Sequence, residues 1–562
     1  MEPVWLEHYP DDVPRRMEFD PARSLVDWIE DALERWPDRP AFTNMGCTLS
    51  FREIDALSLR FAAYLQSDLG LQPGDRVALM LPNLLQYPVA LLGCLRAGMV
   101  VVNVNPLYTP RELKHQLTDS GAVAIVIYAG SAHALSPIIA DTDVRHTLIT
   151  NVGDLLPVPK RQIVNFVVRY VRRMIRPYDL PQAIPYRSFL QADPVGYRRP
   201  EGLSADDLAI LQYTGGTTGL SKGAMLSHGN LIANAAQVNA WFGDYSKGGE
   251  EVIITALPLY HVYALTVNCL TFFEKGSLNV LITDPRDTAG LIKEMSRWPF
   301  SVITGVNTLF QSLVRHPDFK ELDFSTLKVV SAGGMAMQEA TAREFAEITG
   351  KQVIEGYGLT ETSPVLTSNP TNLKEFGGFI GLPLPNTEIS IRDDDGNEVP
   401  IGEAGELYAR GPQVMLGYWN NPEATAATIG EDGFLKTGDM AVADERGYFR
   451  IVDRKKDMII VSGFNVYPNE IENVVTGHPD VLEAAVIGID GDDSGEAVKL
   501  FTVMREGSTL SEKELRSWCK QNMTAYKVPT YVEFVDDLPK SNVGKVLRRE
   551  LREREAAQRA AS

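Results

Sequence analysis

A glycine- and threonine-rich stretch, residues 213–223, constrains this chain more than any other feature. Its glycines would let backbone N–H groups close around an anion, its threonine hydroxyls would donate to phosphate oxygens or bind a metal ion, and Lys222 adds a mobile positive charge. A Walker P-loop is excluded, because Lys222 is followed by Gly223 and Ala224 instead of by serine or threonine. The stretch therefore predicts a phosphate-binding loop of another type, against the alternative of an ordinary surface turn.

Four further segments follow the loop in a fixed order. They are 355–361 (EGYGLTE), 437–439 (TGD), 453–457 (DRKKD) and 539–545 (PKSNVGK). With the loop, they resemble the ordered core motifs of the adenylate-forming superfamily of acyl-CoA synthetases, peptide-synthetase adenylation domains and luciferases. Within it, the chain is most similar to the bacterial long-chain fatty-acid–CoA ligases of β-oxidation. This similarity runs almost end to end, including 4–6 (VWL), 80–83 (MLPN) and 104–109 (VNPLYT).

The resemblance implies a reaction in two steps. A carboxylate does not react with a thiol directly, because its leaving group would be oxide. Attack on the α-phosphorus of ATP would give an acyl-adenylate and pyrophosphate, and coenzyme A would then displace AMP. Three alternatives stay open: an acyl-AMP ligase that loads a carrier protein, a CoA ligase for medium-chain or aryl acids, and a non-catalytic acyl-nucleotide sensor.

The nucleotide site implied by the resemblance is distributed over the loop, the first three segments that follow it and the glycine pair 333–334. The loop would hold the β- and γ-phosphates, Tyr357 would stack on adenine, Asp439 would accept hydrogen bonds from both ribose hydroxyls, and Arg454 would assist at the ribose or phosphate. The full set of expected ATP- and AMP-binding residues is Tyr213, Thr214, Gly215, Gly216, Thr217, Thr218, Gly219, Lys222, Gly333, Gly334, Glu355, Gly356, Tyr357, Gly358, Thr360, Asp439 and Arg454.

Three residues are expected to act in catalysis. Lys545 would stabilise the charge that grows on the carboxylate and the α-phosphate, although alone it could belong to a basic C-terminal helix. His261 would lie near the acyl carboxylate, with a satisfied core histidine as the alternative. Glu361 would bind Mg²⁺ together with Thr214 or Thr217, because a hard cation that bridges phosphates needs oxygen donors.

The acyl group is expected in a tunnel whose wall includes residues 304–310. Some long-chain members of the family place a gating tryptophan four residues after the histidine. This chain has Leu265 there, which leaves the gating in doubt.

The resemblance also implies a moving C-terminal domain, because CoA must approach the adenylate from the side that Lys545 covers. Lys456 matches the hinge position of the family. After rotation, Ser462, Gly463 and Phe464 would line the channel for CoA. The charged run around Lys456 is also what an ordinary exposed linker looks like.

The coarse pattern predicts an α/β fold. Helical stretches alternate with short apolar strands over residues 1 to about 200 and again over 250–350, which argues for two stacked α/β subdomains with parallel sheets. Short strands and turn signals over 376–453 indicate a β-rich subdomain, and the remainder indicates a small mobile α+β domain. The expected division is 1–453 for the AMP-binding domain, 454–457 for the hinge and 458–562 for the C-terminal domain.

Composition narrows the partners and the location. A formal net charge of −19 disfavours nucleic acid, and four widely separated cysteines fit a reduced cytoplasmic protein without a cysteine metal site. The N-terminus has no apolar segment typical of a cleaved signal. The apolar stretch 84–104 contains Arg96 and ends in a β-branched run, so it is expected to be a buried helix and strand instead of a membrane span.

Residues 160–176 are unusual, because they contain six basic residues and no acidic one. Apolar positions at helical spacing predict a basic amphipathic helix that contacts an anionic membrane surface, and so a peripheral location at the inner face of the cytoplasmic membrane. The alternatives are a helix packed on its own domain and a homodimer contact.

Overall fold

The computed structural model describes residues 3–214, 221–243, 248–461, 464–491, 496–541 and 544–561. The first of two large sheets is built around short apolar strands that pair in parallel, as the sequence pattern predicts. Its strand order is β19 (Gly417–Tyr418), β9 (Gly223–Ser227), β8 (Leu208–Tyr213), β4 (Val100–Asn103), β3 (Arg76–Met80), β5 (Ala124–Tyr128), β6 (His146–Thr150) and β7 (Ile184–Pro185).

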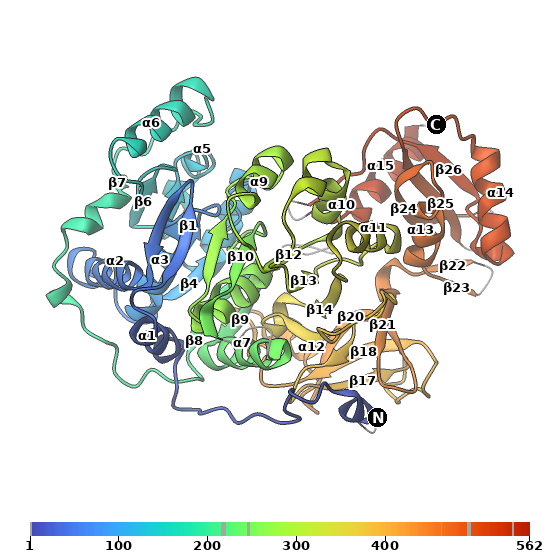
Figure 1. Ribbon diagram of the computed structural model, residues 1–562, viewed down its shortest axis with the longest axis horizontal. Coiled ribbons are helices and arrows are strands. Elements are labelled where there is room, and N and C mark those ends of the chain that lie inside the picture. Colours follow the sequence, from blue (N-terminus) through green and yellow to red (C-terminus); the bar gives the residue numbers. More distant parts are fainter. Residues whose placement is uncertain are drawn as a thin grey trace.

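The second large sheet lies beside the first (Figure 1) and is parallel at its centre. Its order is β16 (Leu382–Pro383), β15 (Val365–Ser368), β14 (Ile354–Gly358), β13 (Val329–Ala332), β12 (Val302–Gly305), β10 (Val252–Thr255), β11 (Leu278–Leu281), β1 (Pro40–Asn44) and β2 (Cys47–Ser50).

Both faces of the first sheet are buried, as expected for parallel strands between helices. Successive side chains of a strand point to opposite faces, so Val77 and Leu79 join the large central core while Ala78 and Met80 join a second core. The central core also takes in the second sheet and the β-rich sheet. The two α/β halves therefore share one interior.

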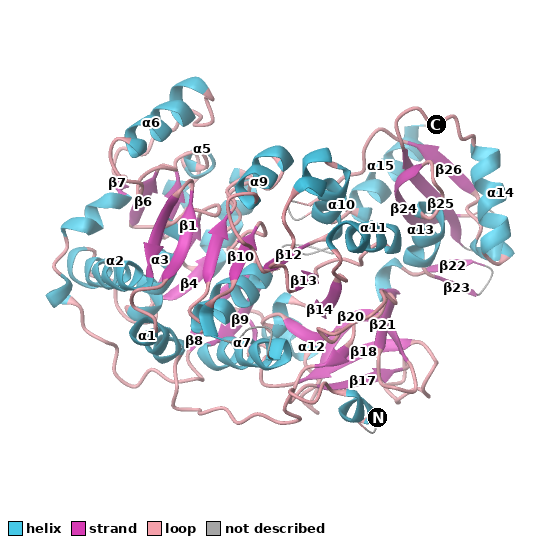
Figure 2. Cartoon of the chain, viewed as in Figure 1, coloured by secondary structure: helices cyan, strands magenta, loops and turns pink. Residues whose placement is uncertain are grey.

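Helices cover the sheets on their outer faces and fill the space between them (Figure 2). Those of the large part of the chain are α1 (Leu25–Arg35), α2 (Phe51–Ala63), α3 (Gln86–Arg96), α4 (Pro110–Ser120), α5 (Ala132–Leu135), α6 (Lys160–Phe166), α7 (His228–Phe242), α8 (Phe272–Glu274), α9 (Thr288–Met295), α10 (Asn307–Arg315), α11 (Glu339–Thr349) and α12 (Pro422–Thr428).

The apolar stretch 84–104 forms a helix and a strand, as predicted. Every residue of α3 and of β4 is buried within the protein. Arg96, the charged residue of this stretch, pairs with Asp55 at 2.6 Å and with Glu30 at 3.4 Å. Among the described residues, no helix combines the length and apolarity that crossing a bilayer requires.

A β-rich sheet closes the lower right of the view in Figure 1. Its antiparallel order is β17 (Glu388–Arg392), β18 (Gly405–Arg410), β20 (Leu435–Ala443) and β21 (Phe449–Arg454). The N-terminal segment is fastened to this region, because Trp5 packs edge-on against Phe449 and the Tyr9 hydroxyl donates to the Pro383 carbonyl at 2.6 Å.

The C-terminal part has separate cores of its own, formed by residues between Ile459 and Leu551. Its elements are β22 (Ile459–Val461), β23 (Phe464–Val466), α13 (Pro468–Thr476), β24 (Val481–Asp490), β25 (Glu496–Met504), α14 (Glu512–Asn522), β26 (Tyr531–Phe534) and α15 (Arg548–Ala561). The predicted fold class, two α/β subdomains with a β-rich subdomain and a small α+β part, is confirmed.

Candidate active site

The ribose end of the predicted site is assembled from three strands. Tyr357 on β14 donates its hydroxyl to Asp439 Oδ2 at 2.6 Å, and Asp439 Oδ1 lies 3.6 Å from Arg454 Nε. Asp439 on β20 and Arg454 on β21 are directly opposite each other in the antiparallel register. Burial and the neighbouring carboxylate raise the pKa of Tyr357, so its hydroxyl stays protonated and remains a donor.

The phosphate end brings together residues from three distant parts of the chain. The Tyr418 hydroxyl donates to Glu361 Oε1 at 2.7 Å, and the ammonium group of Lys222 lies 4.9 Å from the centre of the Tyr418 ring. The Thr214 N–H donates to the Lys222 carbonyl at 3.0 Å and so closes the base of the predicted phosphate loop. Gly215, Gly216, Thr217, Thr218 and Gly219, the centre of that loop, lie outside the described residues.

Tyr418 has no counterpart among the residues predicted from sequence. It reaches Glu361 because β19 pairs antiparallel with β9, the strand that leaves the phosphate loop. The segment around Gly417 and Tyr418 has no charge or glycine cluster to mark it. Only the sheet order shows that it lies beside the loop.

Glycines line the predicted adenine pocket at positions where a side chain would not fit. A Cβ on Gly358 would lie 1.8 Å from the Pro364 carbonyl oxygen, and Gly334 has a φ of +78°. Gly333 follows β13, where a Cβ would lie 3.1 Å from the Tyr263 ring. Packing and backbone conformation therefore favour glycine at these positions, in addition to the room that glycine leaves for a ligand.

Glu355 lies on β14, two residues before Tyr357. The Glu355 carboxylate accepts a hydrogen bond from the Met337 N–H at 2.8 Å, and burial raises its pKa to about 8. Its side chain thus supports the segment after β13. Gly356 lies in β14 and Thr360 begins the short helical turn that carries Glu361.

Lys545 reaches this site from the C-terminal part of the chain. Gly544 has a φ of +80° and packs on Thr308 at the start of α10. The Lys545 carbonyl accepts from the Ser541 N–H at 2.7 Å, and the Lys545 N–H donates to Ser541 Oγ at 3.2 Å. Loss of water in the cleft and the charge of Arg454 lower the pKa of Lys545 to about 7.

His261 follows β10 and lies close enough to Lys545 to be affected by its charge. Burial and then Lys545 lower the pKa of His261 to about 4, so the imidazole is neutral at pH 7. Its Nδ1 accepts a hydrogen bond from the Tyr263 N–H at 3.3 Å, which leaves the proton on Nε2. His261 can therefore donate one hydrogen bond to a carboxylate oxygen.

The segment predicted as a hinge is fastened on both sides of Lys456. Lys455 pairs with Glu406 at 3.0 Å and Asp394 at 2.7 Å, both in the large part of the chain. Asp457 pairs with Arg552 of α15 at 2.7 Å. Lys456 itself is exposed.

Phe464 is the one predicted CoA-binding residue that the structure describes. It lies on β23, is 55% exposed and stacks on Tyr526 with ring centres 4.8 Å apart. Ser462 and Gly463 fall outside the described residues.

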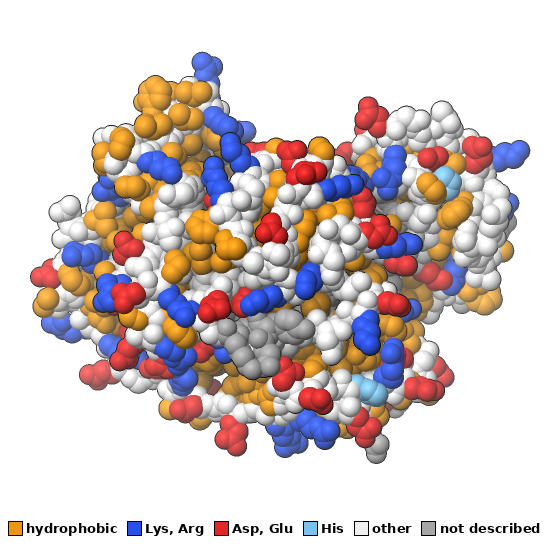
Figure 3. Space-filling view, in the orientation of Figure 1, with side chains coloured by type: hydrophobic (Ala, Val, Ile, Leu, Met, Phe, Trp, Pro, Cys, Tyr) orange, Lys and Arg blue, Asp and Glu red, His pale blue; other side chains and the backbone are white. Residues whose placement is uncertain are grey.

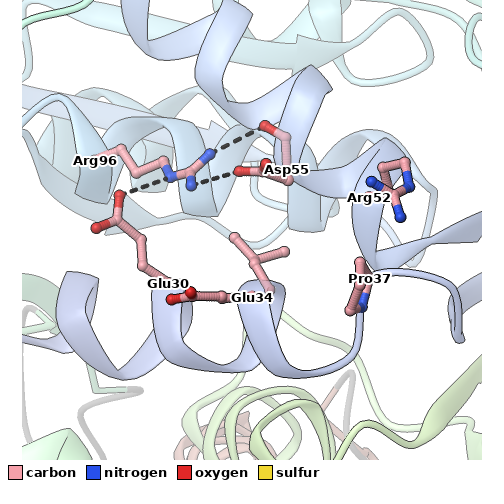
Figure 4. Close-up of a pocket in the computed structure, with 7 residues that line it drawn as sticks. Glu30, Glu34, Pro37, Arg52, Asp55 and Arg96 are labelled. Atoms are coloured by element: carbon pink, nitrogen blue, oxygen red, sulfur yellow. Dashed lines mark hydrogen bonds and ion pairs between the residues drawn. The ribbon is translucent and has the colours of Figure 1, made fainter.

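A separate surface recess lies between α1, α2 and α3 (Figure 4). Glu30, Asp55 and Arg96 line it, and their ion pairs already engage the Arg96 guanidinium. None of the residues predicted for the nucleotide or the acyl group lines this recess.

The comparisons with known proteins agree with the geometry. The family described as AMP-binding enzyme matches residues 29–419, and the AMP-binding enzyme C-terminal domain matches residues 470–545. The chain is 56% identical to a long-chain-fatty-acid–CoA ligase of Yersinia pestis, over 99% of this chain and 98% of the relative.

Solved structures share the whole fold. The ATP-bound MatB of Rhodopseudomonas palustris has a TM-score of 0.80 and 32% identity, over 94% of this chain and 98% of that one. The anthranilate CoA ligase AuaEII, in complex with anthranoyl-AMP, has a TM-score of 0.85 over 97% of this chain and 100% of that one, at 24% identity. The chain belongs to the family of AMP-binding, adenylate-forming enzymes.

Proposed function

We propose that the protein is an ATP-dependent long-chain fatty acid–CoA ligase that feeds β-oxidation. The observation that supports the proposal most is the approach of Lys545, from the C-terminal part, to the bonded pair Tyr357 and Asp439, close enough for the charge of Asp439 to act on the lysine. Its support from similarity is the full-length match to a ligase of that name.

In the first step, a carboxylate oxygen of the fatty acid attacks the α-phosphorus of ATP. The bond from that phosphorus to the bridging oxygen breaks, and pyrophosphate leaves. Asp439 and Tyr357 hold the nucleoside end while Lys222 and the loop hold the departing phosphates, so the reacting atoms stay in line. Protonated Lys545 stabilises the negative charge on the α-phosphate, and neutral His261 donates to the carboxylate without repelling Lys545.

Glu361 and Thr214 would hold Mg²⁺ with the phosphates of ATP, together with Thr217 of the loop. A carboxylate and hydroxyls are the oxygen donors that this ion prefers. When bound, the ion would neutralise phosphate charge. Tyr418 keeps the Glu361 carboxylate in one orientation through its hydroxyl.

In the second step, the CoA thiol gives up its proton and its sulfur attacks the acyl carbon, after which AMP leaves. We place the domain boundary at the hinge 454–457, with rotation about Lys456 removing Lys545 from the cleft and bringing residues 462–464 to the CoA channel. The ion pairs on either side of Lys456 support a pivot at that residue. Asp453, which precedes the pivot, also contacts two residues that follow it. It forms an ion pair with Arg548 at 3.3 Å and accepts a hydrogen bond from the Asn469 N–H at 2.7 Å.

The proposed location is the inner face of the cytoplasmic membrane, with peripheral attachment. Long-chain acids have low solubility and partition into bilayers, so a ligase at that surface meets its substrate where it is concentrated.

The test is a thioester assay with ATP, Mg²⁺, oleate and either CoA or an acyl carrier protein. We expect oleoyl-CoA, AMP and pyrophosphate in equal amounts, and a rate that falls along a series from oleate through octanoate to benzoate. Acylation of the carrier protein without oleoyl-CoA would instead identify an acyl-AMP ligase. A maximum at octanoate or benzoate would identify a ligase for shorter or aryl acids.

A further inference from the structure

A projecting segment near the first sheet carries large apolar side chains in contact with solvent. We call residues 158–176 the docking segment. It contains α6 and stands out at the upper left of Figure 1, at the opposite end from the C-terminal part. Six of its apolar residues are between 50% and 64% exposed: Val158, Ile163, Phe166, Tyr170, Val171 and Met174.

The docking segment is ordered despite this exposure. After α6 the chain continues in a π-helical turn, Val167–Val171, and neither element has a buried residue. The helix predicted over 160–176 is therefore too long, because regular structure ends at Val171 and Arg173 takes a φ of +50°. The left-handed backbone at Arg173 cannot continue a helix.

Contacts on one side fix the segment to the first sheet. Asn165 accepts from the Gly153 N–H at 2.8 Å and donates to Asp154 Oδ1 at 3.0 Å. Ile175 packs against the second core. The exposed side chains of Phe166 and Tyr170 contact each other, with ring centres 5.1 Å apart. The exposed apolar stripe thus has a defined shape, which a docking surface needs.

Positive charge accompanies the apolar stripe. Residues 158–176 include six basic side chains and no acidic one, in a chain of net charge −19. Over the described parts of the chain, none of these six pairs with a carboxylate. Figure 3 shows the Lys and Arg side chains beside the hydrophobic cluster on this projection. Packing on its own domain, one of the alternatives left by the sequence, does not account for the exposed residues.

We propose that the docking segment binds an anionic lipid bilayer. Phe166, Tyr170 and Val171 enter the boundary between headgroups and acyl chains, and the arginines bind lipid phosphates. A second copy fits less well as the occupant. A two-fold contact would place six positive charges of one copy against the same six of the other, and like charges repel.

The proposal assigns the suggested peripheral location to a particular segment. Its advantage to the enzyme rests on the proposed function, because binding to a bilayer helps only an enzyme whose substrate is insoluble in water. Binding itself does not depend on catalysis. The two can therefore be measured separately on the same preparation.

The test uses sedimentation with vesicles of phosphatidylglycerol and phosphatidylethanolamine, and with vesicles of phosphatidylcholine alone. A charge variant carries Arg169→Gln, Arg172→Gln, Arg173→Gln and Arg176→Gln. An apolar variant carries Phe166→Ser, Tyr170→Ser and Val171→Ser. The matched control replaces four basic residues that are exposed elsewhere, with Arg15→Gln, Arg16→Gln, Lys320→Gln and Lys374→Gln.

The charge variant should bind anionic vesicles more weakly by about fivefold for each arginine near the surface. This loss should be largest at low salt, where charges act over longer distances. The apolar variant should lose about tenfold or more, with little dependence on salt, because its loss is hydrophobic. The control should bind like the unmodified protein, and phosphatidylcholine vesicles should bind all four proteins weakly.

Unchanged vesicle binding in both variants would overturn the proposal. So would a change of oligomeric state in either variant without vesicles, measured by light scattering, because it would assign the segment to an interface between copies. Ligase activity on hexanoate, a soluble acid, should be the same in all four proteins. Absence of oleoyl-CoA formation by the unmodified protein, with vesicle binding intact, would refute the long-chain ligase and leave the docking surface standing.

Discussion

The two halves of the active site are held in different ways. On the large domain, Tyr357 is bonded to Asp439 at 2.6 Å and Tyr418 to Glu361 at 2.7 Å. The first bond joins β14 to β20, which belong to different sheets. On the C-terminal part, the backbone of Lys545 is fixed by Ser541. Its ammonium group has no hydrogen-bond or ion-pair partner within the described ranges.

This contrast indicates which part of the site is rigid and which part is free to move. The large-domain half is held in one geometry at two points, since Tyr357 is bonded to Asp439 and Tyr418 to Glu361. The Lys545 ammonium instead lies among other cations in a poorly hydrated cleft, which lowers its pKa. Without ATP, its position is unfavourable for a positive charge. Bound phosphate would reverse this and hold the lysine in place until pyrophosphate leaves.

The largest expected effect comes from removing the lysine that the C-terminal part contributes. Lys545→Ala should slow adenylate formation by roughly two to three orders of magnitude, because one preorganised charge contact in a closed site is worth about 3 to 4 kcal/mol. Transfer from supplied oleoyl-adenylate to CoA should stay within a fewfold of the unmodified rate. Pyrophosphate exchange measures the first step and thioester formation the second. Equal losses in both would show that Lys545 does not leave the site.

The next effect tests the pivot itself. Lys456→Pro should leave adenylation nearly intact and lower CoA transfer on the order of a hundredfold, which corresponds to the ~3 kcal/mol that proline costs where it forbids a backbone conformation. Lys456→Ala is the matched control, because it removes the charge and keeps φ free. If the alanine variant loses as much transfer as the proline variant, the side chain matters and the pivot lies elsewhere.

A smaller effect is expected in the rigid half. Tyr418→Phe removes the hydrogen bond to Glu361 and keeps the ring beside Lys222. A hydrogen bond to a charged group contributes about 1.5 kcal/mol or more, so binding of magnesium and a non-hydrolysable ATP analogue should weaken roughly tenfold. Calorimetric titration measures this without turnover. Tyr531→Phe, at a site 44% exposed on the C-terminal part, should bind normally; unaltered binding by both variants would remove Tyr418 from the site.

The sequence predicted the fold well where local pattern and burial coincide. The apolar runs at β3, β4 and β5 are strands because parallel sheets are buried on both faces, and the turn-rich region 376–453 became the antiparallel sheet. The prediction of a helix over residues 160–176 was wrong at its C-terminal end. Helical spacing continues to Arg176, but the backbone turns at Arg173 and tertiary contacts through Ile175 replace helical bonds.

For the site, the ordered motifs predicted a set of residues but not the contacts that hold them. Tyr357 was expected to face adenine, and its bond to Asp439 depends on how two different sheets, far apart in the sequence, pack together. Tyr418 was missed for the same reason, because its place beside the phosphate loop follows from a long-range strand pair. Side-chain partners of this kind cannot be predicted from spacing along the chain.

The smallest expected effect is on pH dependence, and it separates the two halves without disturbing the fold. Lys545, with a pKa of about 7, is charged below that pH and neutral above it. Only the charged form stabilises the α-phosphate, so kcat/KM for ATP in the adenylation step should fall roughly fivefold between pH 7 and pH 8. His261, with a pKa of about 4, stays neutral over this range and cannot cause the change. The charged groups that act on Lys545 are Arg454, Asp439, Arg548 and Lys456.

Pyrophosphate exchange is the suitable measurement, because it excludes the titration of the CoA thiol. Lys545→Arg keeps a positive charge at every pH in the range, so its profile should be flat whatever its absolute rate. ATP adds negative charge beside the ammonium and should raise the pKa of Lys545, so kcat should decline at higher pH than kcat/KM does. If kcat/KM of the arginine variant also declines near pH 7, another group causes the titration. The low pKa of Lys545 among cations would then not explain how the lysine leaves the site.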